Sequence, residues 1–235
     1  MTSRDRTRLE IAIVLAVTFG TSGLRATLNL INSLLSPAPL NQQRITLNDA
    51  KSSLSWLDLA LQAVSALSLF AWGALALYLL GTRLKAPEAR DWLRGAGLAA
   101  LIGVPGLVLY VAALHFGWTK EIVVATDAAR LPTLLLWSAA NAFGEETVVV
   151  MWLLTRLKQL GWSPGRAIAA SAVLRGTYHL YQGVSAGFGN VVMGVVYAGY
   201  YHRTGRIWPL ILGHFFIDAT AYLGYQLLDL SWLGL

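Results

Sequence analysis

The chain has 235 residues, of which 56% are hydrophobic and only 13% are charged. A soluble domain carries about 25% charged residues, so this composition excludes an ordinary soluble domain and predicts a membrane protein. Cysteine is absent, which excludes disulfide bonds, thiolate metal ligands and cysteine nucleophiles. The net charge of +6 does not predict binding to nucleic acid, because membrane topology explains the distribution of basic residues better.

Apolar stretches long enough to cross a bilayer, which takes about 20 residues, recur along the whole chain. Two weaker stretches, 166–180 and 184–201, are interrupted by Gly or Arg and would span only when packed inside a bundle. We therefore predict an all-α fold, a polytopic membrane helix bundle with seven to eight transmembrane helices; the eighth arises if a long stretch is broken. The clear stretches are 9–35, 54–80, 95–117, 131–156 and 207–229.

The lysines and arginines predict the orientation of this bundle. With the N-terminus in the cytoplasm, twelve of them fall in inner loops and four in outer loops, which fits the positive-inside rule. The outer four are Arg44, Lys51, Lys120 and Arg130. The inner twelve are Arg4, Arg6, Arg8, Arg83, Lys85, Arg90, Arg94, Arg156, Lys158, Arg166, Arg203 and Arg206.

No stretch of the sequence is long and polar enough to form a large extramembrane domain. The longest loop, 36–53, contains Pro37 and Pro39 and is expected to form an ordered or mobile outer cap. We predict one integral membrane domain over residues 1–235, with a catalytic core at about 130–225. Small residues spaced four apart, Gly183 with Gly187 and Gly194 with Ala198, would permit close helix packing.

Six ionisable residues lie inside the later apolar stretches, where each costs at least about 2.5–3.5 kcal/mol to insert. They are Glu145, Glu146, Arg175, His179, His214 and Asp218. At 1.5 Å per residue, the predicted topology puts Glu145 roughly 16 Å and His179 roughly 19 Å from the inner ends of their helices. His214 lies roughly 10 Å and Asp218 roughly 15 Å from the inner end of the last helix. This shared depth predicts a common site.

The local spacings within this set are consistent with a site. Arg175 and His179 are four residues apart and share a helix face, as do His214 and Asp218. Glu145 and Glu146 are adjacent and diverge by about 100° on a helix, so one can point at a common centre while the other binds a supporting cation. Two close carboxylates also suit an acid or base, because one carboxylate raises the pKa of the other.

Hydrolysis of an amide inside a membrane needs a water molecule, a base to activate it and donors for the developing oxyanion. A glutamate and a histidine can hold and deprotonate the water. A second histidine, with a carboxyl group one turn away, can stabilise the oxyanion. This chemistry requires no serine or cysteine nucleophile.

The order Glu-Glu, a histidine 34 residues after the first glutamate, and a late His-x-x-x-Asp resembles the CPBP family of CAAX-protease and bacteriocin-processing (Abi, Rce1-like) intramembrane glutamic endopeptidases. The resemblance covers roughly residues 130–225. It implies that Glu145 activates the water and His179 holds that water. It also implies that His214 and Asp218 form the oxyanion side and that Glu146 is a supporting carboxylate. The matching stretches are Gly144-Glu145-Glu146, Tyr178-His179 and Leu212-Gly213-His214-Phe215-Phe216-Ile217-Asp218.

Two positions depart from the family pattern. The first motif usually reads Glu-Glu-x-x-x-Arg, but Val150 stands at the arginine position; the second usually reads Phe-x-x-x-His, but Arg175 stands at the phenylalanine position. We interpret the departures as linked, because a charge lost from one helix reappears on another. The hypothesis is that Arg175 neutralises Glu146 and that both support the site.

Other interpretations of the same residues stay open at this stage. Glu146 could be a purely structural partner of an arginine, His179 could belong to an aromatic belt with its neighbouring tyrosines, and His214 with Asp218 could be a packed polar pair. His115 and His202 are expected at solvated loop ends.

Three functions compete. The first is an intramembrane endopeptidase without metal or other cofactor. The second is a metal-dependent hydrolase with Glu145, His179, His214 and Asp218 as ligands. The third is a non-catalytic module that binds a partner or lipid, or relays protons. The expected partners are membrane lipid and a protein or peptide substrate, lipidated or not, and no nucleic acid. The expected location is a bacterial plasma membrane.

Overall fold

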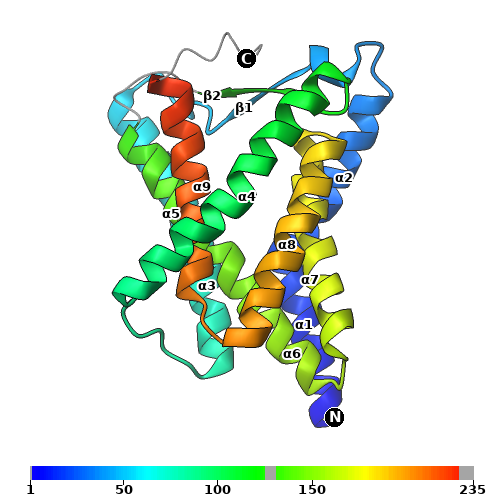
Figure 1. Cartoon of the computed structure of the whole chain (residues 1–235), viewed down its shortest axis with the longest axis vertical. Helices are drawn as coiled ribbons and strands as arrows, with labels where there is room; N and C mark the ends of the chain where they lie inside the picture. Colours follow the sequence, from blue (N-terminus) through cyan, green and yellow to red (C-terminus); the bar gives the residue numbers. More distant parts are fainter. Residues whose placement is uncertain (1, 125–130, 228–235) are drawn as a thin grey trace. The chain divides into compact units, whose positions relative to one another are not determined.

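The computed structural model describes residues 2–124 and 131–227 and is helical except for one short pair of strands (Figure 1). The predicted all-α class is confirmed. Arg130 and the last two residues of the predicted 207–229 segment lie outside the described residues. The elements are α1 (Ser3–Val17), α2 (Phe19–Leu34), the 3-10 turn η1 (Leu40–Gln42), β1 (Arg44–Leu47), α3 (Ser55–Leu80), α4 (Ala89–His115), β2 (Glu121–Val124), α5 (Leu131–Glu145), the π-helix η3 (Glu146–Trp152), α6 (Leu153–Gln159), α7 (Pro164–His179), the 3-10 turn η4 (Leu180–Gln182), α8 (Val184–Thr204) and α9 (Trp208–Leu227).

The first apolar stretch, predicted as one segment over 9–35, is broken at Thr18 into α1 and α2, which meet at a bend of 49°. Thr18 is fully buried, and its hydroxyl donates to the carbonyl of Val14 across 2.6 Å. A threonine bonded to the carbonyl four residues earlier competes with the regular helix and bends it.

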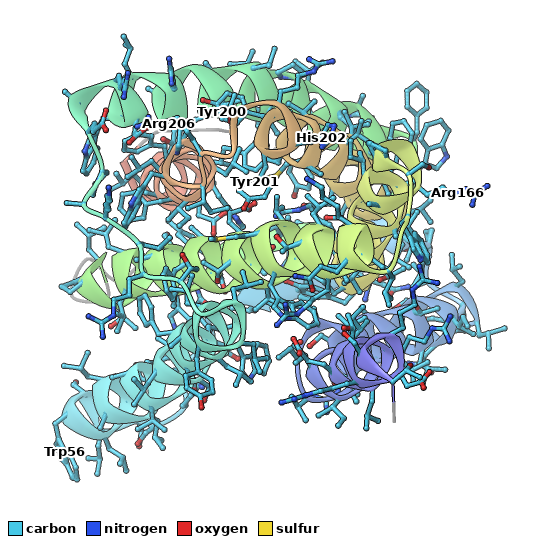
Figure 2. All side chains as sticks on the ribbon, turned by 90° about the horizontal axis from the view of Figure 1, so that it is seen from below. Trp56, Arg166, Tyr200, Tyr201, His202 and Arg206 are labelled. Atoms are coloured by element: carbon cyan, nitrogen blue, oxygen red, sulfur yellow. The ribbon has the colours of Figure 1, made fainter. Side chains whose placement is uncertain are left out.

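Two helices of the described chain, α3 and α4, are individually long and apolar enough to cross a membrane, and the bent pair α1–α2 adds a third if it counts as one span. Their side chains face outward in a way that suits lipid. On α4, Val104 and Val108 are each 65% exposed, and on α3 Trp56 is 70% exposed. Figure 2 shows Trp56 projecting away from its helix. The predicted count of seven to eight transmembrane helices stays a prediction.

The described chain divides into two compact units. The prediction of a single domain over 1–235 stays a prediction. The first unit comprises residues 1–43, 112–120 and 148–206; the second comprises residues 44–111, 121–147 and 207–235.

In the first unit, α7 and α8 lie side by side (Figure 1), and glycines allow their backbones to meet. A Cβ on Gly176 would lie 2.8 Å from the carbonyl oxygen of Gly187, and a Cβ on Gly194 would lie 2.7 Å from the Cα of Ala172. The close packing predicted for Gly187 and Gly194 is therefore confirmed. Helix α1 is tied to α6, where Arg156 Nε donates to Glu10 Oε1 across 2.6 Å.

In the second unit, α5 packs against both α3 and α9 (Figure 1). The contact with α3 is tight, because a Cβ on Gly144 would lie 2.9 Å from the carbonyl oxygen of Leu69. Strands β1 and β2 pair in parallel with Arg44 opposite Glu121. The predicted outer loop 36–53 thus contains ordered structure, and Asn48 Nδ2 from this loop donates to the Tyr222 hydroxyl of α9 across 2.9 Å.

Candidate active site

Four of the six predicted site residues belong to the second unit: Glu145 and Glu146 where α5 ends, and His214 and Asp218 on α9. These two helices pack against each other. Glu146 is fully buried, and His214 and Glu145 are only 5% and 6% exposed. Groups of this kind are stable in a protein interior only when they are paired or hydrogen-bonded, so their contacts define what the cluster can do.

Glu146 and His214 are in direct contact, with Glu146 Oε1 2.8 Å from His214 Nδ1. A carboxylate can only accept a hydrogen bond, so Nδ1 carries the proton in this pair. The other ring nitrogen, Nε2, lies 3.7 Å from Asp218 Oδ2, which is ion-pair range and longer than a hydrogen bond. His214 therefore lies between two carboxyl groups, and a third, that of Glu145, belongs to the residue directly before Glu146.

The backbone changes from α-helix to π-helix at the glutamate pair, with η3 running from Glu146 to Trp152. The run Thr147-Val148-Val149-Val150 consists of β-branched residues, which are poor helix formers, and all four are fully buried. The hydroxyl of Ser171 on α7 donates to the carbonyl of Val149 across 2.7 Å. Short π-helical segments are rare and occur frequently at functional sites, so this irregularity supports a site at Glu145 and Glu146.

The other two predicted site residues, Arg175 and His179, lie one turn apart on α7 in the first unit. The ring of His179 contacts the Arg175 carbonyl, with Nδ1 3.0 Å from the oxygen. A carbonyl oxygen only accepts, so Nδ1 donates, and in a neutral ring Nε2 keeps its lone pair. His179 thus presents Nε2 as a hydrogen-bond acceptor.

Arg175 is fully buried. Its guanidinium carbon lies 5.7 Å from the centre of the Tyr197 ring, a cation–π contact, and its Nη1 is 3.7 Å from the sulfur of Met193. Both partners are on α8, so Arg175 fastens α7 to α8 within the first unit. The predicted pairing of Arg175 with Glu146 stays a prediction.

His202, near the end of α8, is exposed, as is His115 at the end of α4, and both match the expectation for solvated histidines (Figure 2 labels His202). Within residues 2–124 and 131–227, no three His, Asp or Glu side chains form a group that could hold a metal ion.

Three features of the site were not predicted from the sequence. The contact of Glu146 with His214 joins residues 68 positions apart, and no local pattern announces it. The Ser171 hydrogen bond likewise depends on how two helices pack. The π-helix had one available signal, the β-branched run that begins at Thr147.

Residues 127–220 match a family model described as type II CAAX prenyl endopeptidase, Rce1-like. Over these residues the chain is similar to the Rce1-like family, and the resemblance to the CPBP family stated from the sequence motifs is confirmed. The match supports CAAX-type intramembrane protease activity, and it spans all six predicted site residues. Neither a curated protein nor a solved structure matches the chain.

Proposed function

We propose that this Rce1-like chain is an intramembrane endopeptidase that hydrolyses a peptide bond of a membrane-associated substrate, lipidated or not, through an activated water molecule. The observation that carries the proposal is the buried contact of Glu146 with His214, with Asp218 beside the same ring and Glu145 directly before Glu146 in the chain. A buried histidine surrounded by carboxyl groups is a costly arrangement in a membrane protein, and such groups usually mark a functional site.

We assign the attacking water to Glu145 and His179. The role of His179 in holding this water is what the family resemblance implies. Glu145 takes a proton from the water as the water oxygen attacks the carbonyl carbon of the scissile peptide. His179 can accept the second hydrogen of the water on Nε2, because its Nδ1 proton is engaged by the Arg175 carbonyl. The water is thereby aligned for attack.

The oxyanion is assigned to His214. With Nδ1 donating to Glu146, the charged form of the ring carries a second proton on Nε2, which can donate to the negative oxygen of the tetrahedral intermediate. Asp218 stands one turn away on the Nε2 side and orients the ring. Glu146 is a positioning residue in this scheme, because it fixes the ring from the opposite side.

Collapse of the intermediate completes the reaction. The bond between the carbonyl carbon and the peptide nitrogen breaks, and the proton held by Glu145 passes to the leaving amine. The products are a carboxylic acid and an amine, Glu145 is again ionised, and no cofactor takes part in the scheme.

The charge distribution supports the proposed orientation. We place the chain as an integral membrane protein of a bacterial plasma membrane, and we put its N-terminus in the cytoplasm because twelve basic residues fall in the predicted inner loops and four in the outer loops. Its partners are membrane lipid and a protein or peptide substrate, with no role for nucleic acid.

The test is cleavage of a membrane-tethered peptide library by the purified protein in lipid nanodiscs. The wild type should cleave, and Glu145→Gln should not, because glutamine cannot accept the proton of the water. Glu88→Gln is the matched control, since Glu88 is an exposed residue whose carboxylate pairs with Arg90. Equal cleavage by the wild type and Glu145→Gln, or no cleavage by either, would overturn the proposal.

A further inference from the structure

A chain of three aromatic rings connects α2 to the candidate histidine within the first unit. The ring of Phe19 lies 4.9 Å from the ring of Tyr178, and the ring of Tyr178 lies 4.7 Å from the ring of His179, all measured between centroids. Both contacts are tilted, at 39° and 40° between the ring planes. Phe19 and Tyr178 are buried, so these contacts are packed and not incidental.

The break at Thr18 makes Phe19 the first residue of α2. One turn later, Gly23 lets α2 lie directly on the end of α7, because a Cβ at this position would be 2.6 Å from the Thr177 hydroxyl oxygen. The contact between α2 and α7 therefore leaves no room for a side chain at Gly23. It falls on the residues that immediately precede His179.

His179 is the last residue of α7, with a 3-10 turn directly after it. A histidine ring turns about a broad torsion with weak intrinsic preference, so its direction depends on its contacts. Two contacts hold the ring. The Arg175 carbonyl holds Nδ1 at 3.0 Å, and the Tyr178 ring lies against the imidazole.

We infer that Phe19 is a positioning residue for His179, acting through the Tyr178 ring to hold the imidazole so that Nδ1 donates to the Arg175 carbonyl and Nε2 is the acceptor nitrogen. The inference rests on the proposed function, in which that nitrogen holds the attacking water. Phe19 lies outside the family-matched residues 127–220, so the N-terminal helices supply a part of the site that the matched region does not contain.

The competing explanation is that Phe19 only fills the core. Leu30 provides the matched control, because it lies on the same helix and is likewise a buried apolar residue of the first unit. Truncating either residue removes buried apolar surface, but truncating Phe19 also removes a ring that lies 4.9 Å from the Tyr178 ring. A structural role alone predicts the same outcome for both truncations.

The experiment is nitrogen NMR of the histidine rings in the purified full chain in lipid nanodiscs. The chain has four histidines, and the signals of His179 are assigned by their loss in His179→Gln. In the wild type we expect one tautomer, with a proton on Nδ1 and none on Nε2. In Phe19→Ala we expect a mixture of both tautomers, whereas Leu30→Ala should keep the wild-type spectrum.

Phe19→Leu serves if Phe19→Ala does not fold, because leucine keeps most of the volume and loses the ring contact. The inference is overturned if the folded Phe19 variants keep the wild-type tautomer, or if Leu30→Ala disturbs it equally. The spectra test the role of Phe19 even if the wild type cleaves no peptide. In that case the proposed function fails, and the inference about Phe19 is still judged by the tautomer of His179. With cleavage, Phe19→Leu should lower kcat about tenfold with KM nearly unchanged, since small misplacement of a positioned group costs turnover.

Discussion

His214 donates its Nδ1 proton to Oε1 of Glu146 across 2.8 Å, and the pair joins the first residue of η3, directly after α5, to α9. Both side chains are buried. The hydrogen bond therefore holds α5 and α9 in register while it fixes the direction of the imidazole. One contact contributes to the stability of the second unit and to the geometry of the candidate site.

Removing either partner should destabilise the protein. Truncation of one member of a buried ion pair typically costs about 3–5 kcal/mol, because the remaining group is left uncompensated. We expect Glu146→Ala and His214→Ala each to show a loss of this order in thermal unfolding in detergent. The double variant should lose less than the sum of the two.

The matched control is the ion pair of Arg44 with Glu121, whose side chains are 73% and 35% exposed. Exposed pairs contribute about 0–1 kcal/mol, so its double-mutant cycle should show little coupling. Additive losses at Glu146 and His214 would contradict the hydrogen bond between them.

The close contact of α3 with α5 makes a second prediction. A methyl group at Gly144 would meet the Leu69 carbonyl at 2.9 Å, immediately before the glutamate pair. We expect Gly144→Ala to destabilise the protein by about 1–3 kcal/mol, the usual range for overpacking, and to lower cleavage by shifting Glu145.

Gly97, in the middle of α4, has no atom within 4 Å of a built Cβ. Gly97→Ala should be neutral or stabilising by about 0.5–1 kcal/mol, because alanine favours the helix. Thermal shift measurements on Gly144→Ala and Gly97→Ala test the two expectations. A Gly144→Ala variant as stable as the wild type would show that α3 and α5 can move apart without a loss of stability.

Metal removal separates the two hydrolytic mechanisms. In the proposed scheme Glu145 activates the water directly, so cleavage should persist after dialysis against a strong chelator and should still be absent in Glu145→Gln. The measurement is the initial rate of peptide cleavage before and after chelation. Loss of activity in chelator with recovery on added zinc would instead support the metal-dependent hydrolase.

The apolar runs of the sequence predicted most helices well, because the length of an apolar run can be read from the sequence alone. The predicted segment 54–80 corresponds to α3 at Ser55–Leu80, and 184–201 corresponds to α8 at Val184–Thr204. The break at Thr18 could not be predicted, because hydropathy continues across it. The strands β1 and β2 were also missed, since their pairing joins residues 77 positions apart.

The candidate site was predictable only in part. The cost of inserting charged residues singled out Glu146 and His214, because such residues need an explanation wherever they fall in an apolar run. Their direct contact was not predictable, since an i,i+4 rule compares neighbours on one helix and says nothing about partners on another. The same limit hid Phe19, which looks like any apolar residue until α2 is packed on α7.

The hydrogen bond from Ser171 to the Val149 carbonyl gives the last prediction. The bond crosses from α7 to the π-helix that begins at Glu146 and measures 2.7 Å, and Ser171 is buried. Ser171→Ala should lower stability by about 1 kcal/mol and should also lower kcat, because the register of the π-helix sets the direction of the glutamates. Ser171→Thr keeps the hydroxyl and should restore most of both.

Ser138 is the matched control, because it is fully buried but donates to the Leu134 carbonyl of its own helix across 3.0 Å. Such a bond adds little to a carbonyl that the helix already satisfies, so Ser138→Ala should change neither stability nor kcat appreciably. Thermal unfolding and peptide cleavage on the three variants decide the matter. If Ser171→Ala lowers stability but leaves kcat at the wild-type value, the serine only joins two helices and the π-helix holds its register without it.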